Sequence, residues 1–414
     1  MTRISSMEIF NIANSSMQKA NQSIAQTQQQ LSTGQRVITP SDDPVASLKI
    51  LELNDELARI DQYSKNIDSA DNTLQQQEGI LNGVIEILDR IKELTIQGGN
   101  TAVNTKVEYS AMATEIEGRL EELVALANSK DASGDYIFAG FKGDTQPFEG
   151  SVESGFIYQG DDGQRRIKIS NSSSVTVSDS GRDIFMDIPS TKNTVTTYAG
   201  DSNKSIPPLS VSIGNIVDQD TYDKFYPEDM VIKFNDPNDV IPSRVNYTIT
   251  EKSTGNVIVA NQNYNPGEPI NVNGVEISIT GTPVVGDTVM VDSSKNQDIM
   301  TTLVLLARAM REVDDTQQGK EALSKVIKDT LNNVDNAHIN VTKKFAALGA
   351  RMNSLATRRE VLTDSKLFTQ EVLSNFQDLD FAEASSRLAM QTTILEAAQA
   401  SFVRITRLSL FSRL

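Results

Sequence analysis

Residues 31–48 read LSTGQRVITPSDDPVASL, and this stretch separates two segments with helical periodicity. A glycine can adopt the left-handed conformation that commonly ends a helix, and a proline disfavours the helical region for the residue before it. Ser41 or Asp43 can cap a new helix; if Asp43 is the cap, Pro44 takes the first helical position, where its missing N–H costs nothing. An ordinary interhelical loop is the alternative interpretation. The predicted interdomain joint consists of Gly34, Pro40, Ser41, Asp42, Asp43 and Pro44.

Both ends of the chain have apolar residues at heptad spacing, which places them on one face of a helix. Helices of this length are marginal in water on their own, so we expect the two apolar seams to pack against each other. The last residues hold more apolar surface than one seam can use, and neighbouring copies of the chain could cover it. The predicted self-assembly residues are Phe10, Met17, Ile24, Leu31, Leu388, Leu395, Phe402, Ile405, Leu408, Leu410 and Phe411.

Longer heptad patterns follow inside these ends, from Ile60 to Thr95 and from Ile327 to Leu355. Two shorter helices are expected at 109–127 and 299–313, and together these segments predict a helical bundle. Ten of the twelve prolines lie between Pro147 and Pro283. Because proline inside a helix costs about 3 kcal/mol or more, this distribution predicts a non-helical insert between helical arms.

Turn signals within the insert favour β-hairpins. Asn273-Gly274 lies between two alternating runs, and a second pair of strands is expected to meet near Gly255. The predicted fold is mainly α with a β-rich insert: N- and C-terminal arms form a long helical bundle or coiled-coil stalk, with the β domain at its far end. The predicted domains are 1–44 with 377–414 as terminal coiled-coil polymerisation helices, 45–137 with 298–376 as the bundle stalk, and 138–297 as the β-rich outer domain.

The composition offers little for catalysis. The chain has no cysteine and one histidine, His338, which occupies a seam position of a heptad. Common zinc sites and Cys–His nucleophilic pairs are therefore excluded, and we expect no enzyme activity, metal or cofactor. A net charge of −17 argues against nonspecific nucleic-acid binding, and no apolar run is long enough to cross a bilayer. The start lacks the apolar core of a cleavable signal, so the general secretory route is not expected.

Three stretches resemble the flagellin family, and in particular its hook–filament junction members. They are TGQRVITPSDDPVAS at 33–47, DYIFAGFKGDTQPF at 135–148 and QTTILEAAQASFVRITRLSLFSRL at 391–414. In ordinary flagellins small residues usually replace Pro44. The resemblance covers roughly 1–148 and 300–414, whereas the β insert matches only at its edges. Arg413 departs from the family pattern and leaves the packing of the last turn open.

The resemblance implies a flagellin-like fold and a structural role in the bacterial flagellum. It implies an adapter that polymerises in a helical ring of its own copies at the hook–filament junction, between the first hook-associated protein and flagellin. It also implies secretion through the flagellar type III export apparatus, with an export chaperone on the C-terminal segment. The alternatives are a filament-forming flagellin, a flagellin-like protein whose β domain acts as an adhesin, and a secreted enzyme on this scaffold.

Overall fold

The computed structural model describes residues 6–101, 103–152, 155–200 and 202–411; the side chains of residues 6, 7, 9 and 405–411 lie outside what it describes. The chain divides into two compact units, Met1–Asn66 with Ala356–Leu414, and Ile67–Leu355. The divisions fall inside two long helices, whereas the domain limits predicted near 44 and 377 coincide with helix ends. Those domain limits stay predictions.

Helices form both arms of the chain, and the strands lie between them, which confirms the prediction of a mainly α chain with a β-rich insert. The short helices predicted at 109–127 and 299–313 are present, and the first long helix ends at Gly98. Among the described residues, every helix is too short or too polar to span a bilayer. The helices are α1 (Ser6–Thr33), α2 (Pro44–Gly98), α3 (Lys106–Ala127), α4 (Gln219–Phe225), α5 (Ile299–Glu312), α6 (Gln317–Gln377), α7 (Phe381–Phe411), the π-helix η1 (Arg182–Met186) and the 3-10 helix η2 (Pro237–Asp239).

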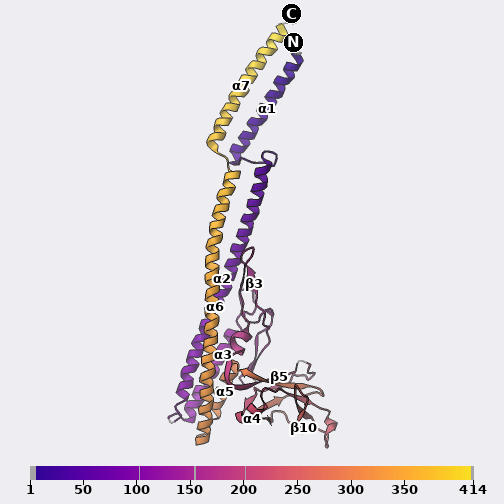
Figure 1. The fold of residues 1–414 in the computed structure, drawn as a ribbon, viewed down its shortest axis with the longest axis vertical. Helices are drawn as coiled ribbons and strands as arrows, with labels where there is room; N and C mark the ends of the chain where they lie inside the picture. Colours follow the sequence, from indigo (N-terminus) through magenta and orange to yellow (C-terminus); the bar gives the residue numbers. More distant parts are fainter. Residues whose placement is uncertain (1–5, 102, 153–154, 201, 412–414) are drawn as a thin grey trace. The chain divides into compact units, whose positions relative to one another are not determined.

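In the first unit, α1 and α7 lie side by side as an antiparallel pair (Figure 1). The seams predicted from their heptads face each other. Ile24, Thr27 and Ala384 are buried between them, and most other seam positions are partly buried. The start of α2 packs on the end of α6 in the same unit, where Lys366 and Asp61 form an ion pair of 2.7 Å.

In the second unit, the heptad residues of α2 form the core of a helical bundle. Ile67, Leu74, Leu81, Leu88 and Ile91 are almost fully buried, which the heptad phase predicted. Helices α3 and α5 pack against each other and complete the bundle with the first part of α6 (Figure 1).

Among the described residues of the second unit, the strands pair antiparallel. A five-stranded sheet has the order β10-β9-β8-β13-β5, and a second sheet has the order β11-β12-β6, with β7 also paired to β12. Two small hairpins, β1-β2 and β3-β4, precede these sheets. The strands are β1 (Phe148–Ser151), β2 (Gly155–Tyr158), β3 (Arg166–Lys168), β4 (Ser174–Thr176), β5 (Pro189–Ala199), β6 (Ser210–Val211), β7 (Asn215–Ile216), β8 (Met230–Phe234), β9 (Asn246–Glu251), β10 (Val257–Asn263), β11 (Pro269–Val272), β12 (Val275–Thr280) and β13 (Thr288–Asn296).

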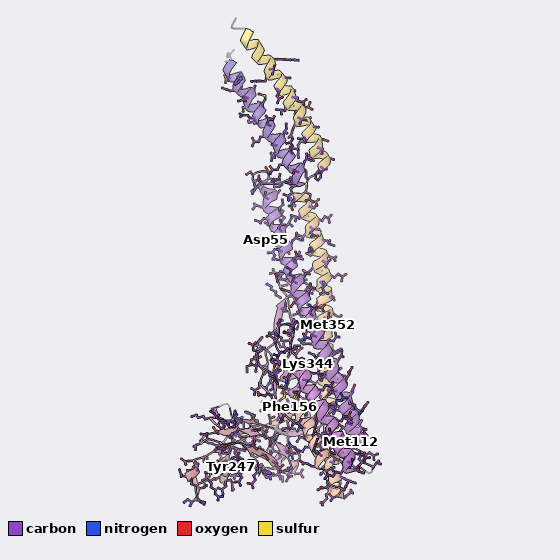
Figure 2. The ribbon with its side chains drawn as sticks, turned by 180° about the vertical axis from the view of Figure 1, so that it is seen from behind. Asp55, Met112, Phe156, Tyr247, Lys344 and Met352 are labelled. Carbon is purple, nitrogen blue, oxygen red and sulfur yellow. The ribbon has the colours of Figure 1, made fainter. Side chains whose placement is uncertain are left out.

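Both predicted hairpins are present. Asn273 and Gly274 have φ values of 48° and 82° and join β11 to β12, which is the left-handed pair that a tight hairpin requires. The two larger sheets share one apolar core, to which Tyr222, Phe234 and Ile277 contribute buried side chains. Figure 2 shows Tyr247 among the strands of this region and Met112 among the helices of the bundle.

Two buried polar contacts tie the segment after β4 to the long helices of the second unit. Gln77 on α2 donates from Nε2 to the backbone oxygen of Val177 at 2.5 Å. Arg351 on α6 donates to both carboxylate oxygens of Asp179 at 2.7 and 3.0 Å. Since Asp179 is 2% exposed, this two-bond pairing compensates for the burial of its charge.

Candidate functional site: the terminal helix pair and its joint

The joint after α1 has the conformation that its sequence predicts. Gly34 adopts a left-handed φ of +71° and its N–H donates to Gln30 at 2.8 Å, which ends the helix. Of the two candidate caps, Asp43 is the one used: its Oδ1 accepts from the N–H of Ala46 at 2.9 Å. Pro44 is then the first residue of α2.

The turn between the helices is organised by one carboxylate. Oδ2 of Asp42 accepts from the N–H groups of Ile38 at 3.2 Å and Thr39 at 2.9 Å, and Oδ1 accepts from Nε2 of Gln26 at 2.7 Å. The hydrogen bond from the Thr39 backbone, with that from Ile38, lowers the pKa of the Asp42 carboxyl below 3.8. Pro40 and Ser41 are exposed in the turn that Asp42 closes.

The second connection of this unit, between α6 and α7, runs alongside the first. Gln35 and Asp378 form an antiparallel bridge. On either side of it, the N–H of Arg36 donates to Gln377 at 2.7 Å and the N–H of Leu379 donates to Gly34 at 2.9 Å. The joint is therefore a two-stranded, hydrogen-bonded element and not a single loop.

Sequence reasoning placed a domain limit between 376 and 377 but did not identify the residues that form this second half of the joint. Asp380 caps α7, because its Oδ1 accepts from the N–H groups of Ala382 at 2.9 Å and Glu383 at 3.1 Å. The motif DFAE at 380–383 is a readable start signal, an aspartate followed three residues later by a glutamate. The bridge to Gln35 has no comparable signal, because it pairs residues far apart in the chain.

Arg36 connects the parts of the joint. Its Nη2 donates to the backbone oxygen of Phe376 at 3.0 Å, and its Nη1 lies 3.5 Å from the carboxylate of Asp43. Its own carbonyl accepts from Nε2 of Gln30 at 2.7 Å. Gln30 in turn accepts from Arg387 on α7 at 3.1 Å, so the polar network extends from the joint into the helix pair.

The predicted assembly residues are brought together along the α1–α7 seam. The rings of Phe10 and Phe402 lie with centroids 5.2 Å apart. Ile24 is buried, and the partly buried seam residues are Met17, Leu31, Leu388 and Leu395. Ile405, Leu408, Leu410 and Phe411 were also predicted to assemble, but their side chains lie outside the described residues.

Pairing of the two seams leaves apolar side chains in solvent on the same unit. On α7, Met390 and Ile394 lie one turn apart on one side of the helix, and they are 68% and 54% exposed. Sequence reasoning missed a second group at the start of α2, where the exposed residues follow a spacing of three. The exposed large apolar residues of this unit are Phe10, Ile12, Val45, Leu48, Leu51, Val361, Leu367, Phe368, Phe381, Met390, Ile394 and Val403.

These features describe an apolar surface with a hydrogen-bonded joint beside it. Over the part of the chain that the structure describes, no group of three carboxylate or imidazole side chains could hold a metal ion. His338 lies partly exposed on α6 with Nε2 3.5 Å from a carboxylate oxygen of Asp89. Helices with apolar side chains in solvent on several sides are typical of proteins that pack against further partners.

Comparisons with known proteins agree with this description. The family model of the bacterial flagellin N-terminal helical region matches residues 4–142, and that of the C-terminal helical region matches 331–414, together more than half of the chain. Flagellar hook-associated protein 3 of Salmonella typhimurium is 24% identical over 384 residues, 92% of this chain and 90% of that protein. Two crystal structures from Legionella pneumophila are each 26% identical to this chain. Hook-associated protein-3 has a TM-score of 0.52 with 79% of this chain and 98% of that chain covered; the flagellar junction protein FlgL has a TM-score of 0.50 with 80% and 99% covered.

Proposed function

Because the chain belongs to the flagellin family, we propose that it is a structural component of the bacterial flagellum that polymerises at the hook–filament junction. There it connects the first hook-associated protein to the flagellin filament. The structures of hook-associated protein-3 and of the junction protein from Legionella pneumophila match this fold over about four fifths of the chain, which supports this role over that of the filament subunit.

One observation carries the proposal. After α1 and α7 have paired, apolar side chains of the same unit stay in water, among them Met390 at 68% and Leu48 at 64% exposure. Burying apolar surface stabilises by roughly 25 cal/mol per Å², so a ring of copies that covers these side chains gains free energy that a monomer cannot. The terminal helices are thus the polymerisation element, with the seam holding each copy together.

The joint gives this element a hydrogen-bonded connection to the rest of its unit. The α1–α2 connection at Gln35 and the α6–α7 connection at Asp378 are hydrogen-bonded to each other, so they bend or turn as one element. A break in both helices at the same level lets the terminal pair adopt the register of the lattice independently of α2 and α6. This role suits an adapter between two assemblies of different mechanical properties.

Delivery to the junction follows from the same assignment. The chain is exported through the flagellar type III apparatus, and before export a chaperone covers the C-terminal segment. The apolar surface of α7 supports this, because an unassembled copy would otherwise expose Met390 and Ile394 to nonspecific association.

A deletion strain tests the function. Loss of the gene is expected to leave hooks without filaments and to release flagellin monomers into the medium, both visible by electron microscopy and immunoblotting. Complementation with Ile394→Glu should fail, because a charge cannot be buried in the ring. Val257→Glu is the matched control, since this valine on β10 is 59% exposed in the other unit. Normal filaments in the deletion strain would refute the junction role, and disappearance of flagellin itself would identify the chain as the filament subunit.

A further inference from the structure

The strands β5 to β13, residues 189–296, have an apolar core of their own, and we call them the sheet region. The side chains of this core include Tyr222, Phe234 and Ile277. Within the described part of the chain, none of the side chains of this core comes from the helices of the bundle. A region with a separate core moves relative to its neighbour unless the interface between them is large and apolar.

Two strands connect the sheet region to the helical bundle. β5 begins at Pro189, shortly after η1, and β13 ends at Asn296, just before α5. These two residues are partners in the β5–β13 pair, and the register shifts between Ser294 and Asn296. An irregularity of this kind disrupts the ladder locally and lets the strand bend. The base of this two-stranded stem is therefore the place where the sheet region can turn.

Hydrogen bonds fix the base of the stem to the bundle. Nδ2 of Asn336 on α6 donates to the backbone oxygen of Pro189 at 2.7 Å. The N–H of Gln297 donates to the backbone oxygen of Ile188 at 2.9 Å, and its Oε1 accepts from Nδ2 of Asn333 at 3.2 Å. Because these bonds lie at the base, they stay intact when the sheet region beyond them turns.

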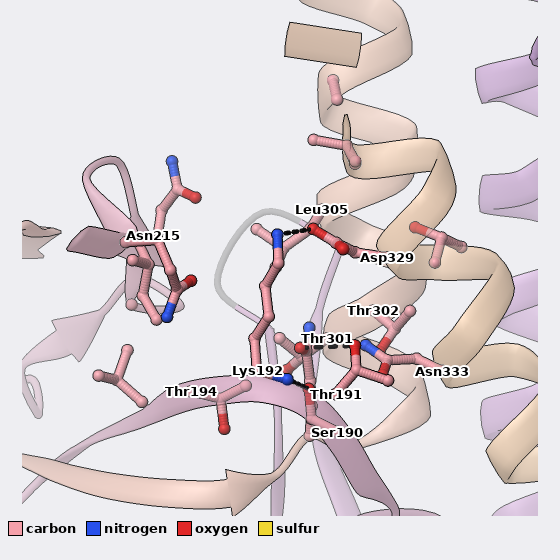
Figure 3. Close-up of a pocket in the computed structure, with 18 of the residues that line it drawn as sticks. Ser190, Thr191, Lys192, Thr194, Asn215, Thr301, Thr302, Leu305, Asp329 and Asn333 are labelled. Carbon is pink, nitrogen blue, oxygen red and sulfur yellow. Dashed lines mark hydrogen bonds and ion pairs between the residues drawn. The ribbon is translucent and has the colours of Figure 1, made fainter. Parts of the chain in front are cut away.

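A cleft of about 270 Å³ lies beside the stem. The start of β5 and the residues around β7 line one side, and α5 and α6 line the other (Figure 3). Nζ of Lys192 on β5 lies 2.5 Å from Oδ2 of Asp329 on α6, so an ion pair spans the cleft (Figure 3). The two side chains are 42% and 32% exposed. Ion pairs with this exposure stabilise weakly and are screened by salt.

An apolar contact of small area also connects the sheet region to the rest of the second unit. Ile213, which precedes β7, lies against Gly155 at the start of β2, where a Cβ would come within 2.4 Å of its Cγ1. One side chain covers far less than the roughly 600–1,500 Å² of a typical interface between domains. Neither this contact nor the ion pair is strong enough to hold the two bodies in a single arrangement.

We propose that the sheet region turns about the base of the β5–β13 stem, between a closed state and an open state of the cleft. In the closed state, which this structure shows, Lys192 and Asp329 are paired. In the open state the pair is broken, both charges are solvated and the cleft is wider, while the core of the sheet region and the bundle are unchanged. The ion pair sets the ratio of the two states. This inference does not depend on the junction role.

Double electron–electron resonance between spin labels tests the motion in the full-length monomer. The chain has no cysteine, so labels attach only to introduced ones. Ile96→Cys on α2 and Val257→Cys on β10 place one label on each body, at positions that are 58% and 59% exposed. Lys192→Gln should raise the ratio of open to closed distances about two- to fivefold, the range for a partly exposed ion pair. Sodium chloride at about 1 M should act in the same direction on the labelled chain that keeps the ion pair.

Three controls separate the ion pair from other effects. Lys328→Gln removes a neighbouring charge on α6 outside the cleft lining, and it should leave the ratio unchanged. Lys192→Asp combined with Asp329→Lys reverses the pair and should restore the original ratio. Labels at Ile96 and Ile339, which both lie on the bundle, should keep one distance in every variant.

Three results would overturn the proposal. The first is a distance distribution between residues 96 and 257 that neither Lys192→Gln nor high salt changes. The second is a change of equal size in Lys328→Gln, and the third is a reversed pair that leaves the ratio where Lys192→Gln put it. Circular dichroism of each variant confirms that the helices remain folded, so the distances report on the stem and the cleft.

Discussion

The guanidinium group of Arg36 donates a hydrogen bond of 3.0 Å to the backbone oxygen of Phe376, a residue 340 positions further along the chain. This contact joins the connection between α1 and α2 to the end of α6. Together with the backbone bridge between Gln35 and Asp378, this contact joins the α1–α2 connection and the α6–α7 connection into one structural element. The terminal helix pair is therefore attached to the rest of its unit through a defined joint.

Shortening an apolar side chain in the α1–α7 seam should impair assembly more strongly than it destabilises the monomer. Leu395 is partly buried in one copy, so Leu395→Ala should lower the free energy of unfolding of the terminal pair by about 1–3 kcal/mol, less than for a fully buried leucine. Assembly completes its burial, so filament attachment should be lost. Thermal melts followed by circular dichroism and electron microscopy measure the two effects, with Leu395→Met as the volume-conserving control. A variant that unfolds earlier but assembles normally would contradict the prediction.

The turn of the joint should weaken in acid. The pKa of the Asp42 carboxyl is lowered below 3.8, chiefly by the Thr39 N–H, so the folded state binds its proton less tightly than the unfolded state does. Its contribution is fully present above pH 3.8 and is lost as the pH falls through the lower, folded value. Asp42→Asn should remove this acid-dependent step and cost about 1 kcal/mol at neutral pH. Hydrogen exchange of the Thr39 amide between pH 2 and 6 tests this; identical pH profiles for both proteins would disprove it.

Two glycines should respond oppositely to alanine. Gly34 has a φ of +71° and space for a methyl group, with Phe381 as its nearest neighbour at 3.7 Å. Gly34→Ala should therefore destabilise by about 1–2 kcal/mol through the backbone alone. Gly349 lies within α6 with open space around it, so Gly349→Ala should stabilise by about 0.5–1 kcal/mol. Urea denaturation measures both, and equal effects of the same sign would refute the conformational explanation.

Replacing only one partner of the buried ion pair between Arg351 and Asp179 should lower the free energy of unfolding of the second unit. Arg351→Met leaves the carboxylate of Asp179 buried and unpaired, and we expect a loss of about 3 kcal/mol, the low end of the usual range because Arg351 is partly exposed. The double variant with Asp179→Asn should recover part of this loss, since it removes the stranded charge. A single variant as stable as the unaltered chain, by denaturant titration, would show that the pair does not anchor the segment after β4.

Much of this fold could be predicted because its signals are local. The heptads place Leu74 and Leu88 in the core of the bundle, and Asn273-Gly274 determines a hairpin. The cap at Asp43 and the left-handed Gly34 could likewise be read from neighbouring residues. Each of these features depends on residues within a turn or two of one another, where spacing and conformational preference decide the outcome.

The parts that sequence reasoning missed depend on contacts between distant residues. The bridge from Gln35 to Asp378 and the role of Arg36 require the two connections to arrive at the same level, which no local pattern encodes. At the start of α2, apolar residues such as Leu48 lie on an exposed face of the helix, whereas the core leucines lie on a packed face. The sequence of the helix does not distinguish these two faces.

The central claim is that the apolar surface left on the terminal helices is covered by other copies of the chain. Methionine oxidation tests this at Met390, which is 68% exposed in the single copy and has a sulfur that reacts readily when accessible to solvent. Hydroxyl-radical footprinting of the monomer and of isolated hook–filament junctions, read by mass spectrometry, compares the two states. We expect rapid oxidation of Met390 in the monomer and at least tenfold slower oxidation in the junction. Equal rates in the two states would contradict the claim.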